Sequence, residues 1–225
     1  MEETYYYKVA ELFTSINGEG VRAGQLAQFL RFAGCNIACS YCDTAWANQP
    51  DTPVIRMSDA EILAQVRKSG ITNLTVTGGE PLIQPGIIHL LEYLARTDQL
   101  RIEVETNGTA ALPSSEAWGE KVTFTMDYKL PGSGMESFMC MENLTRVRTC
   151  DTVKFVVSDR QDLDRAREVI LAYDLTVRCH VYLSPVFGSI DPETIVEYMK
   201  KYEMNNVNLQ IQIHKVIWDP EKRGV

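Results

Sequence analysis

Three closely spaced cysteines constrain the fold of this chain more than any other feature of its sequence. Cys35, Cys39 and Cys42 are separated by three and two residues. Because the 225-residue chain contains only six cysteines, about 0.004 such triplets are expected by chance, so the spacing calls for an explanation. At this spacing a single loop brings three thiolates to one side of a small inorganic group.

The number of thiolates indicates which group that is. Four thiolates would complete a structural zinc site or saturate an iron–sulfur cluster, whereas three leave one iron of a four-iron cluster open to another ligand. We therefore interpret the triplet as the site of a cluster with one open iron. An incomplete zinc site and ordinary buried cysteines are the alternatives.

Length and composition limit the class of protein. A chain of 225 residues accommodates one α/β domain with its own core, and we expect a single domain over residues 1–225. No apolar run approaches the ~20 residues of a membrane span, and the N-terminus lacks the features of a signal peptide. We therefore expect a cytoplasmic protein with reduced thiols. The net charge of −8 argues against a nucleic-acid-binding surface and favours a small-molecule substrate.

Hydrophobic patterning predicts alternating strands and helices, which indicates an α/β fold with a mostly parallel sheet. Ser58 and Glu61 form a capping box at the start of one helix. Residues 45–56 are expected to be a surface loop, and residues 127–134 a lid or dimer-contact loop. The predicted strands are 8–13, 25–31, 73–77, 101–105, 121–126, 152–157, 177–183 and 207–213. The predicted helices are 58–70 and 85–96, with two more beginning at 158 and 191.

Several short segments, taken in order with the cysteines, resemble the 7-carboxy-7-deazaguanine synthase family of the radical S-adenosylmethionine (SAM) enzymes. The C-x3-C-x2-C spacing with Tyr41 before the third cysteine is typical of radical SAM enzymes. The other matching segments are Asn-Gly-Glu-Gly (17–20), Phe-Leu-Arg (29–31), Asp-Thr (43–44), Thr-Gly-Gly-Glu-Pro (77–81), Glu-Thr-Asn-Gly-Thr (105–109) and Lys-Arg-Gly-Val (222–225). The resemblance implies a partial, open TIM-like barrel.

The resemblance also implies the cofactors and the residues that bind them. Cys35, Cys39 and Cys42 would hold a 4Fe-4S cluster, SAM would chelate its open iron, and Thr44 would bind Mg²⁺. Paired glycines after a strand bring backbone carbonyls within reach of the SAM ammonium group. The residues implied to contact SAM are Tyr41, Cys42, Asp43, Gly79, Glu80, Thr106, Asn107, Lys129 and Ser184.

The implied substrate is 6-carboxy-5,6,7,8-tetrahydropterin, which the family converts to 7-carboxy-7-deazaguanine with loss of ammonia. The planar guanidinium of Arg31 suits the substrate carboxylate. Asn17 stands where family members usually carry glutamine, so a backbone contact is expected there. No catalytic residue is assigned beyond the cluster and SAM. The residues implied to contact the substrate are Ile16, Asn17, Gly18, Glu19, Arg31, Thr77 and Val225.

The resemblance further implies an electron donor such as flavodoxin or ferredoxin, a homodimer, and no nucleic-acid or membrane partner. Two other functions stay open at this point. The first is a radical SAM activase that generates a glycyl radical on a partner enzyme. The second is a non-catalytic iron–sulfur or zinc protein, which would neither bind nor cleave SAM.

Overall fold

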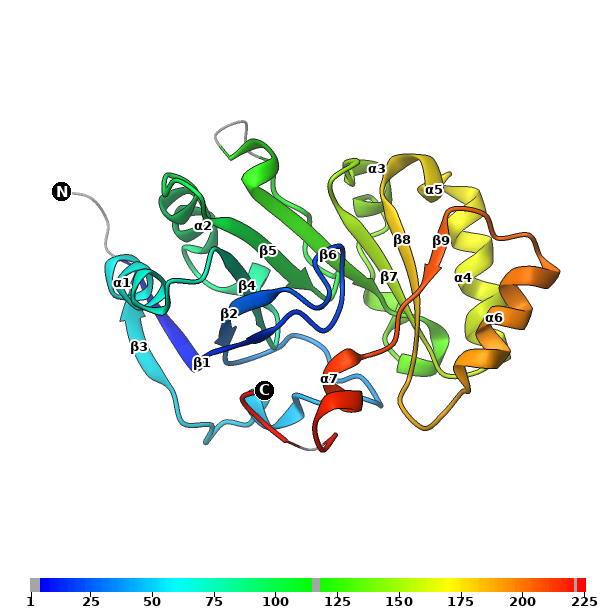
Figure 1. The fold of residues 1–225 in the computed structure, drawn as a ribbon, viewed down its shortest axis with the longest axis horizontal. Coiled ribbons are helices and arrows are strands. Elements are labelled where there is room, and N and C mark those ends of the chain that lie inside the picture. The colour runs from blue at the N-terminus through cyan, green and yellow to red at the C-terminus, as the bar shows by residue number, and fades with distance from the viewer. Residues whose placement is uncertain (1–4, 115–117, 221) are drawn as a thin grey trace.

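A computed structural model describes residues 5–114, 118–220 and 222–225 of the chain. Within these ranges, nine strands form one open sheet in the order β3-β1-β2-β4-β5-β6-β7-β8-β9. From β2 through β9 the neighbouring strands run parallel, whereas β1 is antiparallel to both β2 and β3. The sheet curves into an open partial barrel, as the sequence predicts (Figure 1).

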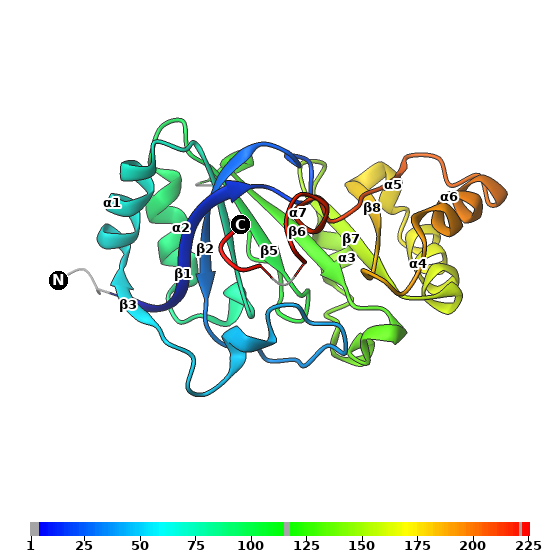
Figure 2. The same cartoon turned by 60° about the horizontal axis from the view of Figure 1, so that its bottom comes forward.

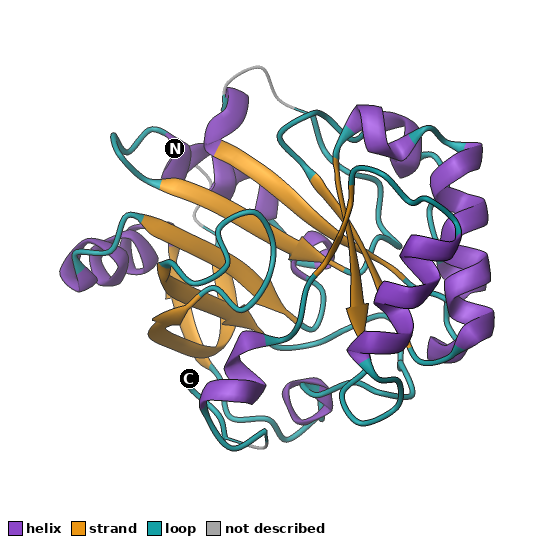
Figure 3. Ribbon diagram, turned by 45° about the vertical axis from the view of Figure 1, so that its right-hand side comes forward, coloured by secondary structure: helices purple, strands orange, loops and turns teal. Residues whose placement is uncertain are grey.

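The strands alternate with helices along most of the chain. The strands are β1 (Tyr6–Ile16), β2 (Leu26–Phe32), β3 (Ile55–Ser58), β4 (Asn73–Gly78), β5 (Arg101–Thr106), β6 (Val122–Tyr128), β7 (Thr152–Val157), β8 (His180–Pro185) and β9 (Val207–Leu209). The α-helices are α1 (Asp59–Ser69), α2 (Ile87–Ala95), α3 (Asn143–Arg146), α4 (Arg160–Ala172), α5 (Leu175–Arg178), α6 (Pro192–Lys201) and α7 (Ile213–Ile217). Most of the helices gather on the outer side of the curved sheet, whereas α7 and long loops lie at its open mouth (Figure 3).

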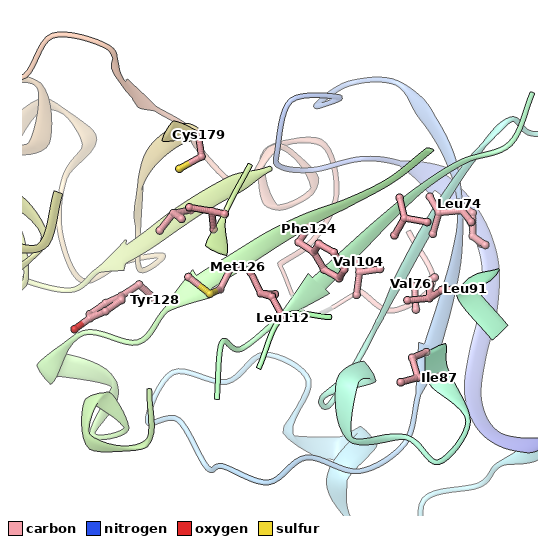
Figure 4. Packing of buried hydrophobic residues seen from close by; sticks show 14 of the residues in the cluster. Leu74, Val76, Ile87, Leu91, Val104, Leu112, Phe124, Met126, Tyr128 and Cys179 are labelled. Atoms are coloured by element: carbon pink, nitrogen blue, oxygen red, sulfur yellow. The ribbon is translucent and has the colours of Figure 1, made fainter. Parts of the chain in front are cut away.

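The two faces of the sheet differ in chemistry because side chains alternate along each strand. On the outer face, Leu74 and Val76 of β4 lie beside Ile87 and Leu91 of α2 (Figure 4), and all four are buried. The inner face is polar instead. Register pairs neighbouring polar residues across it: Arg31 with Thr77, Thr75 with Glu103, Glu105 with Thr125, and Asp127 with Lys154. The outer face of the sheet is therefore apolar where the helices pack on it, and the inner face forms a lumen lined by polar and charged side chains.

The segment between β1 and β2 enters this lumen. The Thr75 hydroxyl donates a hydrogen bond to Asn17 Oδ1 at 2.6 Å. The backbone N–H of Gly20 donates to Gln210 Oε1 at 2.7 Å, and Gln210 Nε2 donates to the Gly20 carbonyl at 3.0 Å. In Figure 1 the dark blue loop accordingly reaches across toward β6. Residues far apart in sequence thus close one side of the lumen.

Local signals predicted several elements correctly. Ser58 caps α1, with its hydroxyl accepting from the Glu61 backbone and the Glu61 carboxylate accepting from the Ser58 backbone. Gly70 ends the same helix in a left-handed conformation with φ of 70°.

The described part of the chain contains no helix with the length and apolar character needed to cross a bilayer.

Other boundaries were predicted wrongly where long-range pairing decides. Residues 45–56 are not all loop, because they include the 3₁₀ helix η1 (Ala45–Asn48) and the start of β3, which pairs with β1. The exposed side chain of Ile55 gives this edge strand no clear buried pattern. The predicted strand 177–183 overlaps the end of α5, and β8 begins only at His180. The predicted strand 207–213 is shorter than expected, because β9 ends at Leu209. His214 therefore does not follow a strand directly but lies in α7.

One further boundary changes. Asp159, not Ser158, is the N-cap of α4, and the Ser158 hydroxyl donates to Asp162 Oδ2 at 2.6 Å. The segment 127–134, predicted to be a lid or dimer-contact loop, packs against α4 in the structure. Its first residues extend β6, and the Gly132 N–H donates to Asp162 Oδ1 at 2.9 Å, which fixes the segment against α4.

Candidate active site

The cysteine loop follows β2 at the mouth of the barrel. Cys35, Cys39 and Cys42 are free and partly buried. Burial raises the pKa of the Cys39 thiol, and the nearby charge of Lys129 opposes this effect. The charges of Cys42 and Cys35 also raise this pKa, so the three thiols lie near one another.

The assignment of the cluster to the three thiols rests on their spacing in the sequence. Among the residues that the structure describes, no group of three or more His, Cys, Asp or Glu side chains is arranged to hold a metal ion.

Polar groups surround the cysteine loop. Asn107 Nδ2, at the end of β5, lies 3.5 Å from Cys35 Sγ and donates to Asn36 Oδ1 at 3.0 Å. Thr44 Oγ1 lies 3.7 Å from Cys42 Sγ. An amide N–H beside a ligating sulfur is the kind of contact that tunes a cluster. The structure thus places Asn107 and Thr44 directly beside the predicted cluster ligands.

The Gly-Gly-Glu segment after β4 contains a narrow cradle. A Cβ atom on Gly79 would lie 2.0 Å from the Gly34 carbonyl oxygen and 2.3 Å from Asn48 Oδ1. The Asn48 oxygen is buried and accepts no hydrogen bond from the described residues. A buried oxygen without a hydrogen-bond donor lowers the stability of the fold, so this oxygen is suited to accept a hydrogen bond from the ammonium group of a bound ligand. Asn48 was missed by sequence reasoning because it lies in the segment predicted to be surface loop.

Glu80 joins the ends of β4 and β5. Its Oε1 accepts from the Leu82 N–H at 2.9 Å and from Thr106 Oγ1 at 2.7 Å. Its Oε2 accepts from the Asn107 N–H at 2.6 Å. The side chain is fully buried, and burial raises the pKa of Glu80 while these hydrogen bonds oppose the rise. Glu80 therefore holds Gly79, Thr106 and Asn107 together at one edge of the sheet.

The predicted substrate loop lies deeper in the lumen. Asn17 is only 3% exposed, and its Nδ2 finds no acceptor among the described residues although Thr75 fixes its Oδ1. A Cβ on Gly18 would lie 2.8 Å from His214 Nδ1, so the α7 imidazole covers this glycine. Burial lowers the pKa of His214. The Asn17 backbone N–H donates to the Gln25 carbonyl and its carbonyl accepts from Gly24, both at 2.8 Å, so the unpaired group at this position is the side-chain amide.

Arg31 and Thr77 face the lumen from neighbouring strands. They are register partners in β2 and β4. Arg31 Nε lies 3.1 Å from Glu11 Oε2, and both side chains are mostly buried. Since Glu11 binds the Nε edge of the guanidinium, the Nη edge is left for another acceptor. The two predicted substrate residues are therefore brought together.

Buried charges cross the lumen between the two loops. Lys154 on β7 forms ion pairs with the Glu19 carboxylate and, at 2.9 Å, with Asp127 Oδ1. Asp127 Oδ2 in turn lies 3.0 Å from Lys129 Nζ. Burial by itself would lower the pKa of Lys154, but the charges of Asp127 and Glu19 outweigh it and hold this pKa well above its usual value. Sequence reasoning missed Lys154 because it sits in a strand of apolar residues.

Glu105 is a second residue that sequence reasoning missed. It lies on the inner face of β5, partly exposed and hydrogen-bonded to Thr77. Burial raises the pKa of Glu105 to about 7, while the positive charge of Lys154 opposes the rise. At neutral pH this carboxyl group is therefore present in both protonation states, and it adjoins the predicted substrate residue Thr77.

Two more predicted cofactor residues, Tyr41 and Ser184, lie in different parts of the lumen. The Tyr41 hydroxyl is buried, its pKa is raised to about 12 by burial, and the Lys129 charge acts on it. The Ser184 hydroxyl donates to Glu19 Oε1 at 3.4 Å, which places Ser184 with the substrate loop.

The C-terminal segment runs along the mouth beside the cysteine loop (Figure 2). Lys215 Nζ of α7 lies 3.6 Å from Asp43 Oδ2. The Arg223 guanidinium lies 4.4 Å from the centre of the Trp46 ring, so the segment that ends at Val225 reaches η1. The predicted residues Asp43 and Val225 are thus placed at the mouth.

Comparison with known proteins identifies the family and the fold. Residues 30–118 match the radical SAM superfamily. The chain is 51% identical to a 7-carboxy-7-deazaguanine synthase from Clostridium acetobutylicum, over 97% of this chain and 99% of the relative. It is 34% identical to another from Chlorobaculum tepidum, over 96% of each chain. The crystal structure of QueE from Escherichia coli shares the fold, with a TM-score of 0.70 at 22% identity over 92% of this chain and 94% of that one.

Proposed function

Because this chain belongs to the 7-carboxy-7-deazaguanine synthase family of radical SAM enzymes, we propose that it converts 6-carboxy-5,6,7,8-tetrahydropterin into 7-carboxy-7-deazaguanine with release of ammonia. The observation that carries the proposal is the 51% identity along nearly the whole of a relative with this name. The arrangement of the lumen supports it, because a cluster loop, an ammonium cradle and a carboxylate-binding arginine open onto one space.

The enzyme uses a 4Fe-4S cluster and SAM, as its family does. When bound, these groups supply the one-electron chemistry that removes a hydrogen atom from the substrate. Cys35, Cys39 and Cys42 hold the cluster, and the Asn107 amide donates toward the Cys35 sulfur. The buried Asn48 oxygen, which lies beside Gly79, would accept a hydrogen bond from the SAM ammonium group. Tyr41, Asp43, Thr106 and Lys129 complete the surroundings of SAM.

The substrate occupies the lumen between the two loops. The free edge of the Arg31 guanidinium binds the pterin carboxylate with two parallel hydrogen bonds. The Asn17 side-chain amide donates to the pterin ring, and the backbone of Ile16 and Gly18 contacts it, since the Asn17 backbone is already paired with Gly24 and Gln25. Thr77 and the Glu19 carboxylate also contact the ring. The C-terminal carboxylate of Val225 reaches the same space over η1.

Release of ammonia requires protons at the departing nitrogen. Glu105 is suited to carry them because its pKa is about 7 and it is hydrogen-bonded to Thr77. Thr44 would supply one oxygen ligand to Mg²⁺, which commonly keeps several waters and needs few protein ligands. Bound there, the ion would help to orient the substrate carboxylate.

The enzyme acts on a small molecule and depends on a reductant. We assign the reductant to the flavodoxin or ferredoxin class, and we expect a homodimer of single-domain chains in the cytoplasm, where the free cysteines stay reduced. The relatives favour neither a glycyl-radical activase nor a non-catalytic metal protein.

One anaerobic assay tests the proposal. The protein is reconstituted with iron and sulfide and supplied with dithionite, SAM, Mg²⁺ and the carboxylated pterin. We expect 7-carboxy-7-deazaguanine and ammonia, measured by mass spectrometry and a coupled ammonia assay. SAM cleavage without the deazapurine would contradict the proposed substrate and point to an activase. Absence of SAM cleavage at full cluster loading would contradict radical SAM chemistry altogether.

A further inference from the structure

Lys154 is a buried cation whose charge is shared between two carboxylates. It lies on the inner face of β7 and is only 7% exposed. Its ammonium group contacts Glu19 and lies 2.9 Å from Asp127 Oδ1. An ammonium ion is buried at this depth only with such partners, since an unpaired one would be strongly destabilising. The Lys154 ammonium group thus fixes the positions of the Glu19 and Asp127 carboxylates.

The Glu19 carboxylate depends on Lys154 for its direction. Its backbone lies between Gly18 and Gly20, and Gln210 holds only the backbone groups of Gly20. In the described part of the chain, the polar contacts of the Glu19 side chain are the ion pair with Lys154 and the longer hydrogen bond from Ser184 at 3.4 Å. A single charged partner therefore sets where this carboxylate points.

Lys154 also connects the substrate loop to the cluster loop. Asp127, its second partner, forms an ion pair of 3.0 Å with Lys129, and the Lys129 charge acts on Cys39. The charges alternate in sign along the line Glu19, Lys154, Asp127 and Lys129. If Lys154 were removed, Glu19 would lose its counterion, whereas Asp127 would keep Lys129. The effect of that loss should therefore fall on the substrate loop.

We propose that Lys154 is a positioning residue that aims the Glu19 carboxylate at the pterin. The inference rests on the proposed function, because it takes Glu19 as a substrate ligand. An ionised carboxylate only accepts hydrogen bonds, so the groups that Glu19 recognises are N–H donors of the aminopyrimidinone or the reduced ring. Lys154 itself need not touch the substrate.

The test measures pterin binding apart from turnover. Equilibrium binding of 6-carboxy-5,6,7,8-tetrahydropterin is measured on reconstituted, SAM-loaded but unreduced enzyme for the wild type, Lys154→Met, Lys154→Arg, Glu19→Gln and the double variant Lys154→Met/Glu19→Gln. Iron content and SAM binding are measured on the same samples. Arg148→Met is the matched control, because Arg148 forms a comparable ion pair of 2.8 Å with buried Asp151 outside the lumen.

We expect Lys154→Met and Glu19→Gln each to raise the pterin Kd about tenfold or more. The first variant releases the Glu19 carboxylate from its position, and the second replaces a charged acceptor with a neutral one. Iron content and SAM binding should not change. The double variant should bind no more weakly than Glu19→Gln, since Lys154 acts through Glu19. Lys154→Arg should recover part of the affinity, and Arg148→Met should lower thermal stability without changing the Kd.

Two results would overturn the inference. An unchanged Kd in Lys154→Met would remove the lysine from substrate binding. If the increases in pterin Kd of the two single variants multiply in the double variant, Lys154 acts independently of Glu19. Failure of the wild type to bind the pterin would instead overturn the proposed function, and the inference with it.

Discussion

Replacing Glu105 with glutamine should make the stability of the enzyme less dependent on pH. Burial raises the pKa of Glu105 from its ordinary 4.5 to about 7. Between these values the folded protein keeps a proton that the unfolded chain releases. The stabilising contribution of this group is therefore complete below pH 4.5 and is lost as the pH rises through 7.

The size of the effect follows from the two pKa values. Titration between 4.5 and 7 lowers the free energy of unfolding by about 2 kcal/mol from pH 5.5 to pH 8.5, as an upper limit. Glu105 is partly exposed, so solvent screening reduces this to about 1 kcal/mol. For a chain of this size the change corresponds to about 2–4 °C in Tm.

The assay compares the Tm of wild type and Glu105→Gln at pH 5.5 and pH 8.5, under anaerobic conditions at equal iron content. The wild type should lose about 2–4 °C more than the variant over this range. Glu197→Gln is the matched control, because the side chain of Glu197 is 60% exposed. An equal loss in wild type and Glu105→Gln would refute the view that Glu105 is held protonated in the fold.

Three further substitutions test the binding roles. Arg31→Ala should raise the KM for the pterin by about 10- to 100-fold through loss of charge-assisted hydrogen bonds, with Arg31→Lys intermediate and iron content unchanged; an unchanged KM would exclude the residue from the site. Asn48→Ala should weaken SAM binding about tenfold in equilibrium dialysis without affecting iron content, and wild-type affinity would contradict the ammonium cradle. Asn17→Leu should raise the pterin KM, whereas Asn17→Gln should retain most of the affinity because it keeps the amide donor; equal KM values would show that only the backbone contributes.

Local sequence signals predicted the parts of the fold that depend on nearby residues. The capping box of Ser58 and Glu61 fixed the start of α1 because both partners lie within one turn. The cysteine spacing indicated the cluster loop for a similar reason. β3 was missed because its strand character comes from pairing with β1, some fifty residues away, and its own exposed side chains show little pattern.

The lumen could be predicted only in part. Arg31 and Thr77 were singled out, and the structure brings them together on adjacent strands. Glu105 was not, because the polar alternation of β5 usually indicates a solvent-facing side, and Lys154 was not, because its strand is mostly apolar. In an open barrel the same alternation lines an interior, and only the curvature of the sheet reveals which of the two applies. Asn48 became significant only when the fold placed it beside Gly79.

The contacts between Gly20 and Gln210 have a consequence for biosynthesis, since they join positions separated by 190 residues. A ribosome-bound chain carries β1, β2 and the cysteine loop well before Gln210 is translated, so one side of the reaction chamber is supplied only by residues made much later. Until Gln210 emerges, this contact cannot close the charged interior on that side. A metallocentre loaded before that point would lie in an unfinished compartment.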